Sequence, residues 1–132
     1  MHKTQPSEYL VLSRGQWDDD LSPEEIQAAI DDFYDWHGKL VDAGRMRQGS
    51  RLKREGRRVS RDAVVDGPFS ESKEIIGGYW HVVAGSLDEA AALMAQNPTL
   101  ACGLEFEVRP LEPERASAFV VGNETPAARL GD

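Results

Sequence analysis

The chain has 132 residues, of which 40% are hydrophobic and 29% charged, so it can form one domain with a hydrophobic core and is not wholly disordered. Its net charge of -8 argues against general nucleic-acid binding, because most of the surface would repel phosphates. A single cysteine, Cys102, excludes an internal disulfide and a zinc knuckle. There is no membrane-length apolar run and no signal-like start, so we expect a cytoplasmic protein without a membrane partner.

The charge is distributed unevenly along the chain. Residues 17–42 hold nine acids and one base, net -8, whereas residues 45–61 hold eight bases and one acid, net +7. We interpret the basic segment as the solvated face and turn of a hairpin that pairs with the acidic helix before it. A local ligand-binding patch is the alternative.

The first predicted elements are a strand over residues 8–13 and a helix over residues 23–43. The strand segment is apolar and rich in strand-forming residues, which favours a central position in a sheet. The helix has a well-specified start. Ser22 suits the N-cap, Pro23 suits the first helical position, and Glu25 completes a capping box.

One face of this helix is apolar apart from a histidine. Its members recur at steps of four and three: Ile26, Ile30, Phe33, His37 and Leu40. Gly44 supplies a stop at the C-terminal end. We therefore expect this face to pack on a sheet.

A basic hairpin is predicted next, with strands over residues 46–53 and 57–65. Residues 54–56 join them, because Gly56 permits the positive backbone angle that a tight turn needs. Pro68 has no amide hydrogen to donate, so the second strand ends before it.

The remaining elements are a strand over residues 78–84, a short helix and a last strand over residues 104–109. The first of these strands is aromatic and β-branched, which favours a central position. Ser86 and Glu89 repeat the capping-box pattern, and the helix ends at Asn97. The last strand alternates, so it should bury Leu104, Phe106 and Val108.

The order β-α-β-β-α-β predicts an α+β, ferredoxin-like fold, with an antiparallel sheet and both helices on one face. The other face would expose apolar side chains, at about 25 cal/mol per Å². We therefore expect a homodimer in which two copies cover each other's sheets. Residues 1–111 form the domain, and residues 112–132 a tail or arm whose apolar residues 118–121 contact a partner or their own protein.

Several motifs occur in the order and spacing of one known family. They are Asp66-Gly67-Pro68-Phe69, Glu71, Lys73-Glu74, Gly77-Gly78-Tyr79, Ser86-Leu87-Asp88-Glu89-Ala90 and Glu107-Val108-Arg109-Pro110-Leu111. Over roughly residues 8–111 the chain resembles the YCII-related family, specifically its DGPF branch. The resemblance implies a dimeric α+β barrel, in which paired sheets form a shared barrel, and a function that is mostly unassigned.

The resemblance also implies a candidate acid–base pair, because some YCII-type proteins carry a histidine and an aspartate in that role. Asp66 is the candidate aspartate, and His37 is the candidate histidine, one turn after the family's position near Phe33. Such a pair can shuttle protons at neutral pH if its members lie within hydrogen-bond reach. Alternatively, Asp66 fixes its own turn and His37 is a satisfied histidine at the edge of the core.

Ionisable side chains crowd the segment after Asp66. Glu71, Lys73 and Glu74 are candidate ligand-binding residues, because charged side chains on a rigid loop suit ligand capture. The alternative for Lys73 and Glu74 is a surface ion pair. His81 is a further candidate, facing a pocket or the dimer partner, or else a buried and satisfied histidine.

Metal and nucleotide sites are not predicted. The three histidines lack metal-ligand spacing, and there is no P-loop or GxGxxG motif, so we expect no metal and no cofactor.

Two functions remain open. The first is a cofactor-free acid–base enzyme acting on a small organic anion, with Asp66 as acid or base and Lys73 or an arginine holding the substrate. The second is a non-catalytic ligand-binding or regulatory module, since DGPF-type domains resemble companions of alternative sigma factors. Neither requires direct nucleic-acid binding by this chain.

Overall fold

The computed structural model describes residues 5–67 and 75–130. In chain order its elements are β1 (Ser7–Arg14), α1 (Pro23–Asp42), β2 (Met46–Arg51), β3 (Arg57–Val59), β4 (Val64–Asp66), β5 (Ile76–Ala84), α2 (Leu87–Met94), η2 (Pro98–Cys102), β6 (Glu105–Pro110) and η3 (Ala127–Arg129). The elements η2 and η3 are short 3₁₀ helices. No helix in the two described ranges is long and apolar enough to span a membrane.

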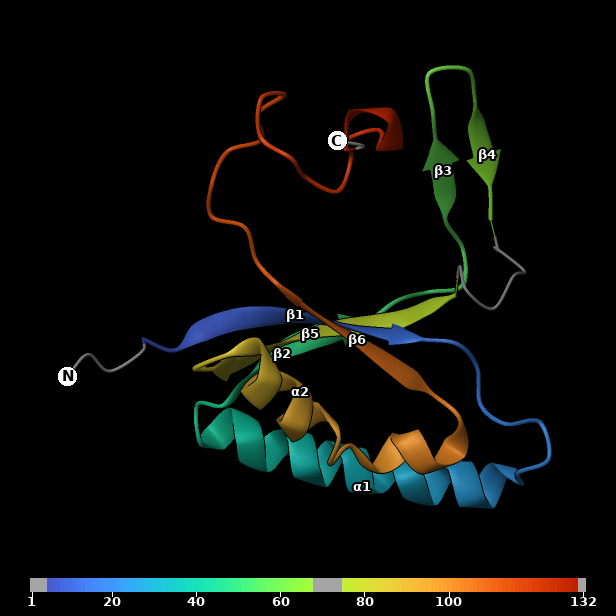
Figure 1. Cartoon of the computed structure of the whole chain (residues 1–132). Coiled ribbons are helices and arrows are strands. Elements are labelled where there is room, and N and C mark those ends of the chain that lie inside the picture. Colours follow the sequence, from blue (N-terminus) through green and yellow to red (C-terminus); the bar gives the residue numbers. More distant parts are fainter. Residues whose placement is uncertain (1–4, 68–74, 131–132) are drawn as a thin grey trace.

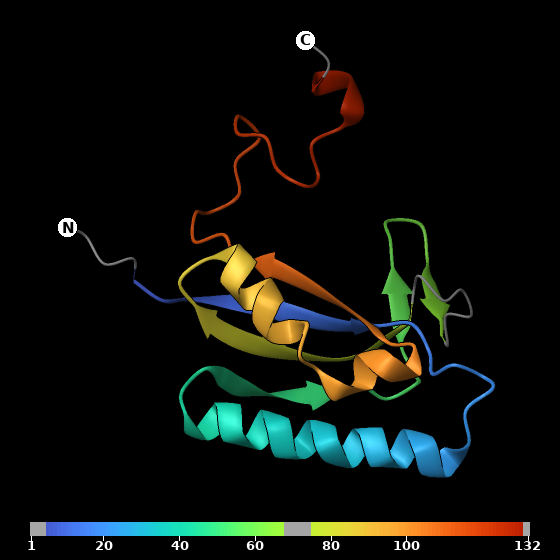
Figure 2. The same ribbon diagram turned by 60° about the horizontal axis from the view of Figure 1, so that its bottom comes forward.

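Four strands form one antiparallel sheet in the order β2-β5-β1-β6, so β1 and β5 are central, as predicted. Figures 1 and 2 show α1 and α2 together on one face of this sheet. The strands β3 and β4 form a separate two-stranded hairpin. Apart from that hairpin, the order is β-α-β-β-α-β, which confirms the predicted α+β, ferredoxin-like fold.

The helix α1 begins and ends where its local signals predict. Ser22 Oγ accepts a hydrogen bond from the backbone N–H of Glu25 at 3.1 Å, and the Glu25 carboxylate accepts one from the Ser22 N–H at 3.3 Å. At the other end, Ala43 is the C-cap and Gly44 follows with a φ of +74°. A residue with a side chain would be strained in that conformation, so the glycine ends the helix.

The core lies between the sheet and the helices. In β1, Tyr9, Val11 and Ser13 are buried on the helix-covered face, because alternate side chains of a strand point to the same side. The rest of the buried cluster comes from β2, β5 and α2: Met46, Val82, Ala84, Ala90, Leu93 and Met94. Each large aliphatic side chain buried there contributes about 1.5–3 kcal/mol.

The predicted pairing of the basic hairpin is wrong. The strand β2 pairs with β5 rather than with residues 57–65, and residues 57–66 fold back on themselves as β3 and β4. The turn lies near Ser60, whose N–H donates to Ala63 O at 2.9 Å. Burial explains the difference, since β5 supplies an apolar partner with buried residues, whereas every residue of β3 and β4 is exposed.

Two arginines of the basic segment, residues 45–61, form ion pairs with residues outside the acidic helix. Arg47 forms an ion pair with Glu8 at 3.2 Å, and Arg57 pairs with Asp66 across the hairpin at 3.0 Å.

The last strand, β6, begins one residue later than predicted, and Leu104, Phe106 and Val108 are half-buried rather than buried. Phe106 and Val108 pack against the core from the helix-covered face. On the other face, Glu107 accepts hydrogen bonds from Arg109 at 3.0 Å and from Arg14 at 2.8 Å. These two guanidinium groups, Arg109 first, hold the pKa of Glu107 below its ordinary value.

The sheet face opposite α1 and α2 is called the bare face below. Leu10 and Leu12 of β1 lie on it, paired with His81 and Tyr79 of β5, and both leucines are half-buried. In Figure 1 the β3–β4 hairpin and the chain after β6 project on this side.

Candidate functional site

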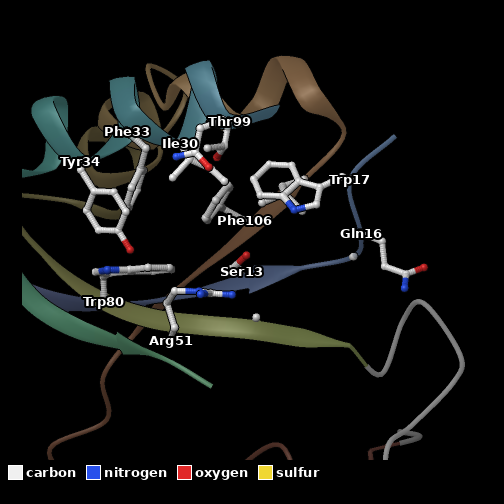
Figure 3. Close-up of a pocket in the computed structure, with 14 residues that line it drawn as sticks. Ser13, Gln16, Trp17, Ile30, Phe33, Tyr34, Arg51, Trp80, Thr99 and Phe106 are labelled. Carbon is white, nitrogen blue, oxygen red and sulfur yellow. The ribbon is translucent and has the colours of Figure 1, made fainter. Parts of the chain in front are cut away.

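A cavity of about 480 Å³ lies between α1 and the helix-covered face of the sheet. Figure 3 shows the side chains around it. They come from β1 and the loop after it, α1, β2, β5, η2 and β6: Ser13, Gly15, Gln16, Trp17, Gln27, Ile30, Phe33, Tyr34, Arg51, Gly77, Trp80, Thr99, Leu104 and Phe106. Pockets of about 300–1,000 Å³ hold small organic molecules, so the cavity has a suitable size.

Aromatic rings form much of the wall. Phe33 of α1 meets Trp80 of β5 edge-on, with ring centroids 5.4 Å apart and planes at 66°. The ring centroids of Tyr34 and Phe33 are 5.4 Å apart, and those of Phe106 and Trp80 are 6.3 Å apart. Because these rings hold one another in place, they form a firm apolar surface on which a flat molecule can stack.

Arg51 has the only charged side chain among the described residues that line the cavity. In Figure 3 its guanidinium lies along the floor of the cavity, near Ser13. It forms no ion pair with any described residue. Its rigid fork of N–H donors is therefore available to an anion.

A bulge in β2 turns Arg51 toward the cavity. Met46 faces the core, so strict alternation would place residue 51, five positions later, on the bare face. The register shifts between Arg47 and Ser50, and Arg51 then pairs with Gly78 on the helix-covered face.

Two glycines make this close packing of β2 and β5 possible. A Cβ atom at Gly49, inside the bulge, would overlap the backbone carbonyl of Tyr79. A Cβ atom at Gly78 would lie 2.8 Å from Ser50 O and 3.0 Å from the Trp80 ring. The direction of the Arg51 side chain therefore depends on glycine at both positions.

Trp17 closes one end of the cavity from the loop after β1 (Figure 3). The next residue, Asp18, donates its backbone N–H to Cys102 O at 2.9 Å. Gly103 has a φ of +100°, and a Cβ atom there would collide with the Asp18 side chain. The end of η2 thus holds this loop, and with it the tryptophan, against the domain.

Two buried hydroxyl groups add neutral polar contacts. Ser13 and Thr99 both line the cavity and are nearly inaccessible to solvent. Thr99 Oγ1 donates to Asn97 Oδ1 at 2.7 Å, which leaves the Thr99 oxygen lone pairs as acceptors for a ligand donor.

His37 lies behind the cavity wall. Its ring is stacked on Phe33, with centroids 5.6 Å apart and planes at 7°, and the residue is 4% exposed. Neither ring nitrogen has a hydrogen-bond partner of good geometry among the described residues, although the Gln48 side chain lies near. Burial lowers the pKa of His37, and the contact with Gln48 offsets part of this effect. The imidazole is therefore neutral at pH 7.

Asp66 is at the end of β4, on the hairpin that projects from the bare-face side (Figure 1). Its carboxylate pairs with Arg57 Nε at 3.0 Å, and its side chain is 80% exposed. The sheet separates Asp66 from His37, so the structure does not bring the two together as an acid–base pair.

His81 lies on the bare face, where its ring meets Tyr79 edge-on with centroids 6.3 Å apart. Its neighbour in β5, Trp80, lines the cavity, so His81 points away from the cavity. The other candidate ligand contacts lie outside the described residues: Glu71, Lys73 and Glu74.

Sequence reasoning missed Arg51 and Trp17 as site residues. Arg51 is one base among many in its segment, and only the bulge distinguishes it. Gly49 within a strand pattern is a local signal of such a bulge. Trp17 lies in a loop without periodicity, so its position depends on the distant residue Gly103.

Comparisons with known proteins extend this description. The family model of the YCII-related domain matches residues 7–114. Among solved structures, the chain is similar to the 5-chloro-2-hydroxyhydroquinone dehydrochlorinase TftG from Burkholderia phenoliruptrix AC1100, in complex with 2,5-dihydroxybenzoquinone. The two share 18% sequence identity, the match covers 80% of this chain and 93% of that chain, and the TM-score is 0.44. No curated protein sequence matches the chain.

Proposed function

This chain belongs to the YCII-related domain family, and we propose that it is a member of the family's DGPF branch. We propose further that it binds a small, flat organic anion in the cavity between α1 and the sheet. The observation that carries the proposal is Arg51, a cation without a described ion-pair partner on the floor of a cavity walled by aromatic rings.

The cavity favours a planar anion for two reasons. Its rings, Phe33 and Trp80 among them, offer apolar contact to a flat ligand. The Arg51 guanidinium can bind a carboxylate or phenolate through charge-assisted hydrogen bonds, in the bidentate geometry that lysine cannot supply. The volume of about 480 Å³ limits the ligand to a small molecule.

Binding, rather than proton transfer, is the function that this geometry supports best. The described lining contains no carboxylate, imidazole or amine that could act as a general base. His37 lies behind Phe33, and Asp66 lies on the other side of the sheet. The acid–base reaction considered from the sequence has no support from their positions.

The test is calorimetry with aromatic carboxylates and phenolates, each compared with its uncharged amide or ether. We expect the anions to bind and Arg51→Gln to weaken their binding by about 10- to 100-fold, because it removes a charged hydrogen-bond donor. Arg47→Gln is the matched control. Arg47 lies in the same strand, but it pairs with Glu8 on the bare face. Its substitution should leave binding unchanged.

Three results would contradict the proposal. The first is no binding by any anion of the series. The second is equal affinity for anions and their uncharged analogues. The third is equal loss of affinity in the two arginine variants.

We also propose that a second copy of the chain covers the bare face. Leu10 and Leu12 leave apolar surface in water near its centre, at about 25 cal/mol per Å². The face carries charges of both signs, for example Glu8 and Arg47, which suits a two-fold contact between identical surfaces. Leu12→Lys should therefore give a monomer in sedimentation equilibrium at micromolar concentration. A wild-type chain that is itself monomeric there would refute the dimer.

A further inference from the structure

Two segments project from the bare-face side of the molecule (Figure 1). One is the β3–β4 hairpin, and the other is the tail, residues 112–130 of the described chain. Figure 2 shows from a second direction that both extend away from the sheet. These two segments are called the arms below. Both leave the domain beside the surface that the proposed second copy covers.

The hairpin arm has too little structure to be stable by itself. Its two strands have three residues each, and among the described elements they contact substantially only each other. Val59 pairs with Val64 in the ladder, yet the two residues are 74% and 64% exposed. An isolated two-stranded hairpin is marginal in water, so this valine pair requires a covering surface.

The tail arm exposes the most apolar segment of its part of the chain. Phe119 is 99% exposed, and Val120 and Val121 are 68% and 69% exposed. The hydrogen bonds described for the tail are local, such as Val120 N–H to Ser117 O at 3.3 Å. No part of the described chain therefore covers the Phe119 ring.

The total surface of the chain agrees with this description. A compact monomer of 14.6 kDa exposes roughly 6,900 Å², whereas this chain exposes 10273 Å². The excess of about 3,400 Å² includes the surface of residues outside the described ranges, and each chain of an obligate homodimer buries roughly 1,000–2,500 Å². A dimer that covers the arms together with the sheet face would therefore remove a large part of the excess.

The position of the arms favours a second copy as the molecule that they contact. Both project from the side of the bare face, which the second copy is proposed to cover (Figure 1). The hairpin arm, residues 57–66, is nearly neutral, with three bases and two acids, so its contact with another copy is chiefly apolar. Two-fold symmetry would use each such contact twice.

We propose that both arms contact the second copy, the hairpin through Val59 and Val64 and the tail through Phe119 and Val121. The proposal rests on the sheet-to-sheet dimer proposed above and adds that the arms contribute to its affinity.

Sedimentation equilibrium of the full chain tests the proposal. We expect the hairpin variant V59S/V64S and the tail variant F119S/V121S each to raise the dimer dissociation constant at least about tenfold, because each removes two apolar side chains from the contact with the second copy. Leu87→Ser is the control. Leu87 is also an exposed apolar residue, at 42%, but it lies on the helix-covered side in α2. Thermal unfolding of each variant checks that the domain itself is folded.

The outcomes separate the two proposals. A monomeric wild-type chain overturns both. The second outcome is a wild-type dimer that Leu12→Lys dissociates, with the same dissociation constant in both arm variants and in the control. This result overturns the role of the arms but supports the sheet-to-sheet dimer. A decrease in dimer affinity for the arm variants, with no change in the Leu87→Ser control, supports the arms as dimer contacts.

Discussion

At the scale of single residues, His37 places a polar ring in an apolar layer. Both of its nitrogens lack well-formed hydrogen bonds within the described chain, and the pKa of the imidazole is lowered chiefly by burial. In the unfolded chain the same side chain returns to its ordinary pKa of 6.5. Between the two pKa values the unfolded state binds more protons, so folding is disfavoured as the pH falls through that interval.

The first prediction follows from this difference. The contribution of His37 to stability is complete above pH 6.5 and decreases as the pH falls toward the lower folded-state pKa. In His37→Phe, which retains a ring against Phe33, the free energy of unfolding should vary less between pH 6.5 and pH 5. Urea unfolding at several pH values measures this. Glu107 also has a lowered pKa, but it changes the free energy of unfolding near and below its ordinary pKa of 4.5, outside this pH range. Identical pH profiles for the variant and the wild type would exclude His37 as the source.

The second prediction concerns Gly49. In Gly49→Ala the new Cβ atom would overlap the Tyr79 carbonyl, so β2 must move away from β5. We expect a loss of about 1–3 kcal/mol in the free energy of unfolding, together with weaker binding of the anions, because the bulge no longer directs Arg51.

Gly38→Ala is the matched control for Gly49→Ala. A Cβ atom at Gly38, within α1, meets no atom within 4 Å, so alanine should stabilise the helix by about 0.5–1 kcal/mol. Denaturant titration of both variants gives the comparison. If Gly49→Ala proved as stable as the wild type and bound the anions equally well, the bulge would not determine the direction of Arg51.

At the scale of elements, α1 supports the wall of the cavity and depends on its N-cap. Ser22→Ala removes the hydrogen bond to the Glu25 N–H and should cost about 1 kcal/mol. Chemical unfolding monitored by circular dichroism measures this loss. A variant as stable as the wild type would show that the cap adds nothing in this protein.

Elements with strong local signals were predicted correctly. The capping box at Ser22, the glycine after α1 and the position of β6 each depend on residues close together in sequence. The partner of β2 was predicted wrongly, because strand pairing joins distant residues. The local pattern favours the nearby segment 57–65 as the partner, whereas β5 offers the larger apolar surface.

At the scale of the whole molecule, charge is placed unevenly about the sheet. The helix α1, which contains much of the acidic segment, lies on one side of the sheet, and β3, near the end of the basic segment, projects from the other side (Figure 1). Because every copy also has a net charge of -8, two copies repel one another at long range, and salt screens this repulsion beyond about 8 Å at physiological ionic strength.

From the sequence alone, the type and order of the main elements could be derived, and with them the ferredoxin-like fold and the family resemblance. Caps, turns and side-chain periodicity are short-range properties, so they can be read along the chain. Three features of the site required the tertiary structure: the pairing of β2 with β5, the bulge that directs Arg51 into the cavity, and the separation of Asp66 from His37 by the sheet. Each depends on contacts between residues far apart in sequence, where the burial of one side chain is decided by another element.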